Sequence, residues 1–240
     1  MTQRAALVTG ASSGIGLAVA HVLGEAGYAL TVTSRRPEKL DAAAAELRGH
    51  GYEVTDVAAN VADYEEVAFV VAHHRDAYGR LDVLVNNAGM GIAGPFQDTL
   101  PKWIDLQLAV NLRSMMLFYR EALVMLKEAG AEHGNALVVN MSSITGKHGE
   151  ELLAVYSAAK HGIVGFTESM NGELKNAGVK SCALCPGFVD TSLSDFIKHE
   201  IPADKMIRCE DVAEAVRFLL RLSVQCVVPE IMFTRPGDRL

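Results

Sequence analysis

The sequence contains little cysteine and fewer basic than acidic side chains. Its 240 residues include four cysteines, and 22 lysines and arginines stand against 29 aspartates and glutamates, which gives a formal net charge of −7. No basic stripe offsets this balance locally. The charge therefore argues against nucleic acid or an anionic membrane as a partner.

Two of the cysteines have the spacing of a redox or zinc motif, but their surroundings predict a strand. Cys182 and Cys185 lie in the run "VKSCALCPG", and residues three apart on a strand point to opposite faces. No second pair completes a metal site. We therefore expect buried structural cysteines and no bound metal.

Long hydrophobic runs, proline-rich linkers, low-complexity blocks and fixed-period repeats are also absent from the sequence. The first apolar run meets a glycine turn at Gly10, too early for a signal peptide or a membrane span, so we expect a cytoplasmic protein. Half of the residues are apolar, which permits a large buried core. The length suits a single domain that extends over residues 1–240.

Short apolar runs alternate with helical stretches along almost the whole chain. Amphipathic helices near 14–26, 37–48 and 64–78 separate the first four runs, and the predicted strands are "AALVTG", "ALTVTSR", "YEVTDVAAN", "LDVLVNNAG", "NALVVNMSS", "VKSCALCPG" and "VPEIMFTR". This alternation is typical of βαβ units. The sequence therefore predicts an α/β fold, a Rossmann-type doubly wound domain with a seven-stranded, mostly parallel sheet flanked by helices.

Polar or glycine-rich segments follow five of the predicted strands. They read "TGASSGIG", "SRR", "NNAG", "NMSS" and "CPGFVDT". In a doubly wound sheet, ligands bind outside the carboxyl ends of the strands, where the strand order reverses. We therefore expect the five segments to meet at one edge of the sheet and to form a binding site.

The first of these segments predicts a dinucleotide site. It carries Gly10, Gly14 and Gly16 in a turn that leads from a strand into a helix. Such a turn lets backbone N–H groups and the helix N-terminus approach a pyrophosphate closely.

The segment after the second predicted strand bears on the choice between NADP and NAD. Ser34 is neutral there, and Arg35 and Arg36 follow it. An acidic side chain would bind the ribose hydroxyls and repel a 2′-phosphate, whereas arginine does the reverse. The run therefore favours NADP, with solvated arginines before a helix as the alternative interpretation.

Tyr156 and Lys160 in "YSAAK" stand four residues apart, so on a helix they share one face. A free tyrosine has a pKa near ~10, and a neighbouring positive charge stabilises its phenolate. The pair suits acid/base catalysis. An exposed tyrosine and lysine on a helix surface are the structural alternative.

Taken in order, these motifs resemble those of the classical short-chain dehydrogenase/reductase family. The similarity extends over about residues 5–191 and rests on "TGASSGIG", "NNAG", Asn111 in "AVNL", Ser143 in "NMSS", "YSAAK" and "PGFVDT". The resemblance implies an oxidoreductase that transfers a hydride between NADP(H) and a carbonyl or secondary alcohol. An NAD-preferring dehydrogenase and a non-catalytic protein that senses nicotinamide nucleotides or serves as a partner subunit are the alternatives.

The resemblance also implies roles for single residues. Tyr156 would be the general acid, and Lys160 would lower the pKa of that phenol and hold the nicotinamide ribose. Ser143 would hydrogen-bond the substrate oxygen, and Asn111 would anchor a water that connects Lys160 to solvent. The implied cofactor contacts are Gly10, Ser12, Ser13, Gly14, Ile15, Gly16, Ser34, Arg35, Arg36, Asn60, Val61, Asn87, Ala88, Gly89, Tyr156, Lys160, Pro186, Gly187, Val189 and Thr191.

The chain departs from the family pattern in three places. Asn60 stands where an aspartate often holds the adenine, Ser13 replaces a basic residue, and the C-terminal segment lacks the glycine-rich end of tetrameric relatives. The family implies a homodimer or homotetramer built through helices near 103–127 and 156–176. We expect a small carbonyl or alcohol compound as the substrate, which the sequence does not identify. The short loop after Thr191 predicts either an apolar lid formed by Phe196, Ile197, Ile201 and Met206 or an open cleft.

Overall fold

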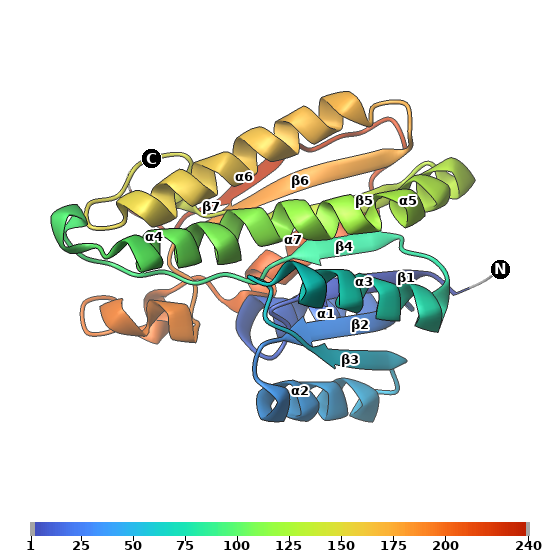
Figure 1. Cartoon of the computed structure of the whole chain (residues 1–240), viewed down its shortest axis with the longest axis horizontal. Coiled ribbons are helices and arrows are strands. Elements are labelled where there is room, and N and C mark those ends of the chain that lie inside the picture. The colour runs from blue at the N-terminus through green and yellow to red at the C-terminus, as the bar shows by residue number, and fades with distance from the viewer. Residues whose placement is uncertain (1–2, 239–240) are drawn as a thin grey trace.

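A computed structural model describes residues 3–238, which form a twisted sheet between two layers of helices (Figure 1). The sheet has seven strands in the order β3-β2-β1-β4-β5-β6-β7, and every neighbouring pair is parallel. The strands are β1 (Ala5–Thr9), β2 (Ala29–Ser34), β3 (Val54–Ala58), β4 (Val83–Asn86), β5 (Ala136–Met141), β6 (Val179–Pro186) and β7 (Glu230–Phe233). The predicted doubly wound, seven-stranded sheet is confirmed, and it is parallel throughout.

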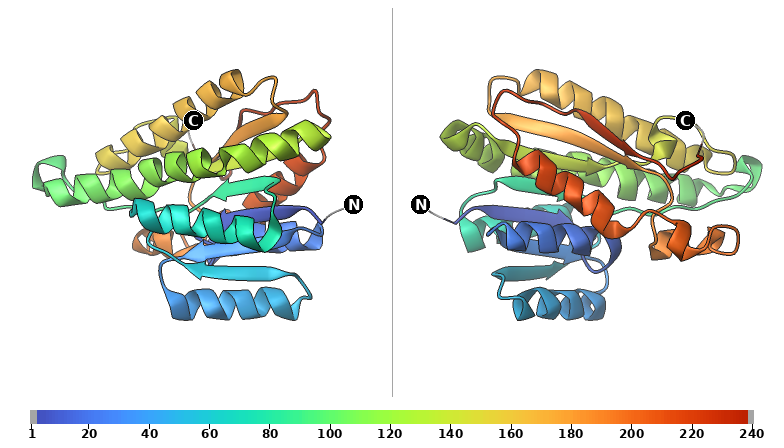
Figure 2. Two further views of the ribbon diagram at one scale, coloured as in Figure 1. Left: turned by 45° about the vertical axis from the view of Figure 1, so that its right-hand side comes forward. Right: turned by 180° about the vertical axis from the view of Figure 1, so that it is seen from behind.

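Helices cover both faces of the sheet, as the opposite views in Figure 2 show. Helices α1 (Gly14–Glu25), α2 (Pro37–Gly49) and α7 (Cys209–Leu220) contribute to one apolar core. On the other face, α3 (Tyr64–Tyr78), α5 (Ser114–His133) and α6 (Ala154–Glu173) contribute to the second core. None of the helices within residues 3–238 combines the length and the apolarity that a membrane span requires.

The strands are apolar along their whole length because both of their faces are covered. Successive side chains of β1 alternate between the two cores, since Ala6 and Val8 belong to one and Leu7 to the other. Cys182 and Cys185 on β6 are likewise buried in separate clusters and form no disulfide. This confirms the prediction that they are structural cysteines on opposite faces.

The helix expected near residues 103–127 is interrupted. Helix α4 (Pro101–Leu108) passes into a π-helical turn at Ala109–Arg113, and α5 continues from it. Asn111 lies in this turn. Single π-turns inside helices often occur at functional sites.

The direction of winding reverses between β1 and β4. Strand β1 pairs with β2 on one side and with β4 on the other. The carboxyl ends of these strands therefore diverge into separate loops and leave a cleft, which is where a doubly wound sheet binds ligands.

Candidate active site

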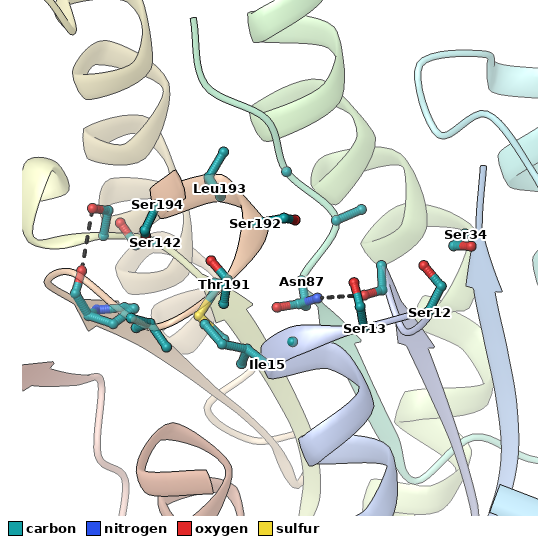
Figure 3. A pocket seen from close by; sticks show the side chains of 18 of the residues that line it. Ser12, Ser13, Ile15, Ser34, Asn87, Ser142, Thr191, Ser192, Leu193 and Ser194 are labelled. Carbon is teal, nitrogen blue, oxygen red and sulfur yellow. Dashed lines mark hydrogen bonds between the residues drawn. The ribbon is translucent and has the colours of Figure 1, made fainter. Parts of the chain in front are cut away.

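A cleft of about 340 Å³ opens at the carboxyl edge of the sheet (Figure 3). All five segments that the sequence predicted to meet supply lining residues: "TGASSGIG", "SRR", "NNAG", "NMSS" and "CPGFVDT". The described lining residues include no aspartate or glutamate, although the whole chain has a net charge of −7. Its cationic side chains are Arg35, Arg36, Lys39 and Lys160. The cleft is therefore suited to an anionic ligand.

The glycine turn after β1 is packed against the loop after β4. Gly10 has a φ of 65° and Gly14 a φ of 59°, which is the left-handed region that favours glycine. A Cβ on Gly10 would lie 2.9 Å from the Cα of Ala88 and 2.9 Å from Nδ2 of Asn87. The absence of a side chain at Gly10 thus allows the two loops to meet.

Hydrogen bonds fix the same contact. The Thr9 hydroxyl accepts from the backbone N–H groups of Asn87 (3.0 Å) and Ala88 (2.9 Å). The side-chain amide of Asn87 donates to the carbonyl oxygens of Thr9 and Gly10, both at 3.1 Å. Asn87 thus lines the cleft and also joins the loop after β4 to the glycine turn after β1 (Figure 3).

Helix α1 begins at the cleft with free N–H groups. Ser13 precedes the helix and its side chain makes no capping bond, and the first turn has no acidic residue. Unpaired N–H groups at a helix N-terminus attract anions. Gly16 lies behind this turn rather than on the cleft surface, because a Cβ there would lie 2.3 Å from the Gly10 carbonyl oxygen.

The end of β2 supplies the second polar wall. Ser34 is buried, lines the cleft and has a hydroxyl without a hydrogen-bond partner. Arg35 and Arg36 follow it, line the cleft and are exposed. The structure thus brings together the three residues on which the sequence based its preference for NADP.

Ser143 caps a turn and also lies beside Tyr156. Its Oγ accepts from the Thr145 backbone N–H at 3.2 Å, so that it caps the 3-10 turn Ile144–Gly146. The same hydroxyl donates to the Pro186 carbonyl oxygen at 3.4 Å and makes a side-chain hydrogen bond with Tyr156. The cap thus holds the serine beside the phenol.

Tyr156 and Lys160 lie one turn apart on α6, both in the cleft wall. Burial raises the pKa of Tyr156 to about 12, and the hydrogen bond with Ser143 opposes that shift. Burial lowers the pKa of Lys160 to about 8. The Lys160 Nζ donates to the Met141 carbonyl oxygen at 2.7 Å and lies 5.4 Å from the centre of the Tyr156 ring.

The expectation that Lys160 lowers the Tyr156 pKa is therefore not met in this structure. The lysine is directed to a backbone oxygen, and removal of the phenol from water raises the pKa of Tyr156, opposed only by the hydrogen bond with Ser143. At neutral pH, Tyr156 is a protonated phenol that can donate a hydrogen bond.

The Asn111 amide satisfies backbone groups around the π-turn. Its Oδ1 accepts from the Met90 N–H at 3.1 Å, and its Nδ2 donates to the carbonyl oxygens of Met90 and Gln107, both at 2.8 Å. It does not line the cleft. A Cβ on Gly89 would lie 3.0 Å from Asn111 Oδ1 and 3.7 Å from Lys160 Nζ, so Asn111 and Lys160 both pack against this glycine.

Two further residues of the predicted set do not line the cleft. Asn60 accepts from the Ala62 N–H at 3.3 Å through its side chain, and its own N–H donates to Glu66. Val61 is buried in the core beside α3. Both residues form the turn that leads from β3 into that helix.

The structure adds six lining residues to the individually predicted contacts, and two of them, Met141 and Ser142, belong to the predicted segment "NMSS". The six are Lys39, Met141, Ser142, Ser192, Leu193 and Ser194. Lys39 stands one helical turn after Arg35 and Arg36, and that spacing was a usable signal. The others depend on how the strand ends and the 3-10 segment Ser192–Ile197 fold over the cleft.

None of the four residues expected to form an apolar lid, Phe196, Ile197, Ile201 and Met206, lines the cleft. Phe196 is exposed and packs edge to face on Phe188, with ring centroids 6.4 Å apart. Met206 is instead buried, and its neighbour Ile207 pairs with Val189 beneath the segment. Leu193 is the apolar residue of this segment that lines the cleft.

The parallel sheet, the glycine turn and the cleft at the switch point define a Rossmann-type fold. A family model described as short chain dehydrogenase matches residues 4–201. The chain belongs to this family of oxidoreductases.

Individual relatives match over almost their whole length. The chain is 36% identical to a 3-oxoacyl-[acyl-carrier-protein] reductase of Synechocystis sp., over 91% of this chain and 90% of that protein. Among solved structures, an alcohol dehydrogenase of Thermococcus sibiricus complexed with 5-hydroxy-NADP has a TM-score of 0.88, 28% identity, and coverage of 99% of this chain and 98% of that one. A variant of actinorhodin polyketide ketoreductase with NADPH has a TM-score of 0.87 and 31% identity, covering 97% of each chain.

Proposed function

We propose that the protein is an NADP(H)-dependent oxidoreductase that interconverts a carbonyl compound and a secondary alcohol. The observation that carries this proposal is one cleft that combines an acid-free, cationic surface with a hydrogen-bonded Ser143 and Tyr156 and a buried Lys160. The cationic surface supports binding of a phosphorylated cofactor. The side-chain group supports proton transfer to a substrate oxygen.

The residues present fit a nicotinamide dinucleotide phosphate. The left-handed Gly10 and Gly14 and the uncapped start of α1 suit a pyrophosphate. Ser34, with its unpartnered hydroxyl, and Arg35 suit a phosphate on the adenosine ribose. The bound nicotinamide would supply the hydride, which is chemistry that protein side chains lack.

Tyr156 would be the proton donor during reduction. With a pKa of about 12 it holds its proton at neutral pH, as a general acid must before the reaction. The hydrogen bond between Ser143 and Tyr156 would orient both hydroxyl groups toward one substrate oxygen. Lys160 would place a positive charge near the phenolate that forms, because its ammonium lies in the same wall.

NADP is preferred to NAD in this proposal because no carboxylate among the described lining residues stands ready for the adenosine ribose hydroxyls. The two solved relatives above were crystallised with NADPH and with 5-hydroxy-NADP. The substrate class stays at the level of a carbonyl compound. A 3-oxoacyl thioester is one candidate, since the Synechocystis relative is a 3-oxoacyl-[acyl-carrier-protein] reductase.

A fluorescence titration of the purified protein with NADPH and, separately, with NADH tests the cofactor part of the proposal. We expect clearly tighter binding of NADPH. Tighter binding of NADH would overturn the NADP preference, and binding of neither nucleotide would overturn the proposed function. Arg35→Ala should weaken the NADPH complex about tenfold or more and leave NADH unchanged, because a charge-assisted hydrogen bond is lost only with NADPH.

A further inference from the structure

We propose that Lys39, in the first turn of α2, is a third cationic ligand of the cofactor's 2′-phosphate and strengthens the preference for NADP. The inference rests on the proposed function, because it concerns the same cleft. It adds a residue that lies outside the strand-end segment Ser34–Arg36.

Lys39 shares the adenosine end of the cleft with that segment. It lines the cleft together with Ser34, Arg35 and Arg36. In Figure 3, Ser34 lies with Ser12 and Ser13 at the end of the cleft that is remote from Ser142 and Ser194. Arg35, Arg36 and Lys39 follow this buried serine within five residues of the chain, whereas Tyr156 and Lys160 lie on α6.

The charged groups of these three residues have no partner in the described part of the protein. Within residues 3–238, no hydrogen bond or ion pair involves the side chain of Arg35, Arg36 or Lys39. Other arginines in this acidic chain are engaged, for example Arg48 with Asp56 and Arg217 with Glu25. Glu38 is the acidic neighbour of Lys39 along α2, and it does not line the cleft. A cluster of free positive charges on an acid-free surface indicates an anionic ligand.

The position of Lys39 is unfavourable for the helix alone. It stands third in α2, after Pro37 and Glu38, where the partial positive charge of the helix N-terminus repels a cation. The residue before the helix, Arg36, makes no side-chain capping bond, so the first N–H groups also have no side-chain partner. An anion beside this turn would reverse the sign of both interactions.

A second observation points to a ligand at the same place. Ser34 is 8% exposed and its hydroxyl has no hydrogen-bond partner. Buried hydroxyl groups are nearly always partnered, so an isolated one requires an explanation. A phosphate oxygen would accept that hydrogen and would be surrounded by the three cations.

The three side chains would differ in what they recognise. An arginine presents a fixed planar fork to two phosphate oxygens, whereas the Lys39 ammonium is a point charge on a flexible stem. Lys39 would therefore add electrostatic affinity without a strict geometry. NADH has no phosphate at that position, so its affinity would not depend on Lys39.

Binding measurements on the full chain test this without any substrate. We would titrate Lys39→Ala and Lys39→Gln with NADPH, NADH, 2′,5′-ADP and 5′-AMP, and compare them with Lys175→Ala, which removes an exposed lysine just after α6 and away from the cleft. The Lys39 variants should bind NADPH and 2′,5′-ADP about fivefold more weakly, the effect of a partly solvated ion pair, and should bind NADH and 5′-AMP normally. Lys39→Arg should retain wild-type affinity, and Lys175→Ala should change nothing.

Unchanged NADPH affinity in both Lys39→Ala and Lys39→Gln would overturn the inference while leaving the proposed function intact. Equal weakening for NADPH and NADH would also overturn it, because the lysine would then support the fold of the site and not the phosphate. If the wild-type protein bound neither nucleotide, both proposals would fall, and the wild-type titration alone would show this.

Discussion

The buried histidine His74 should make the protein lose stability in mild acid. It lies on α3 with no exposed surface, between β2 and the turn that precedes β4. Its Nδ1 is 2.7 Å from the Thr31 hydroxyl and its Nε2 is 2.9 Å from the Arg80 carbonyl oxygen. A carbonyl oxygen only accepts, so Nε2 carries the hydrogen and Nδ1 accepts from Thr31. The neutral ring is thus fully satisfied.

The structure also gives the magnitude. Burial lowers the pKa of His74 from 6.5 to about 4, against the opposing effects of the Arg80 carbonyl and of Asp82. As pH falls below 6.5, His74 becomes protonated in the unfolded chain, whereas in the folded chain it stays neutral until the pH approaches about 4. Stability is therefore constant above pH 7 with respect to this group, and the difference between the two pKa values corresponds to a loss of about 3 kcal/mol by pH 4.

Urea unfolding of the wild type and of His74→Gln, each measured from pH 7.5 to pH 4.5, isolates this contribution. The glutamine variant should be less stable at pH 7.5, because it loses packing and one of the two hydrogen bonds. Its free energy of unfolding should then fall less steeply with pH than that of the wild type, by about 2.5 kcal/mol over the range. Other acid-sensitive groups, such as Asp82, are common to both proteins and cancel in the difference. Parallel pH profiles would refute the reasoning.

Two further predictions concern the site. Gly16→Ala should destabilise the fold by about 2 kcal/mol and impair NADPH binding, because its Cβ would lie 2.3 Å from the rigid Gly10 carbonyl oxygen. The control is Gly49→Ala, whose new Cβ has no atom within 4 Å. This variant should bind NADPH normally and be as stable as the wild type or slightly more stable. Equal unfolding midpoints for Gly16→Ala and Gly49→Ala would contradict the predicted clash at Gly16. The rate of carbonyl reduction should decline as pH rises from 7 to 9, because Lys160, with a pKa of about 8, loses its charge while Tyr156 stays protonated. A profile of kcat/KM that stays flat to pH 9.5 would show that the charge of Lys160 does not contribute.

The strand pattern and the order of the motifs predicted the sheet, because a strand covered on both faces is an unbroken apolar run and its carboxyl end is marked by polar or glycine residues. The same features and the order of the motifs predicted one shared site for Gly10, Ser34, Tyr156 and Lys160, and all four residues line the cleft. These are local features, and each can be read from a few adjacent letters.

The remaining features depend on contacts between distant segments. Asn60 and Gly16 have the residue type of a ligand contact. In the folded chain, however, Asn60 stabilises the turn before α3, and Gly16 allows α1 to pack against the Gly10 carbonyl oxygen. The burial that raises the Tyr156 pKa arises only in the folded chain, where Ser143 after β5 and Gly91 after β4 lie beside the phenol. Lys39 was not predicted because it lies in α2, beyond the strand-end segment that finishes at Arg36, although the helical spacing places Lys39 near Arg36.

The most direct test of the account is carbonyl reduction by Tyr156→Phe, set against Tyr64→Phe, a change of the same kind on α3 outside the cleft. The substrate for both would be the carbonyl compound that the wild type reduces fastest with NADPH in a screen of ketones, sugars and 3-oxoacyl thioesters. We predict that Tyr156→Phe folds and binds NADPH as the wild type does and yet loses nearly all turnover, whereas Tyr64→Phe keeps it. Turnover by Tyr156→Phe close to the wild-type rate, with NADPH binding intact, would contradict the assignment of Tyr156 as the proton donor.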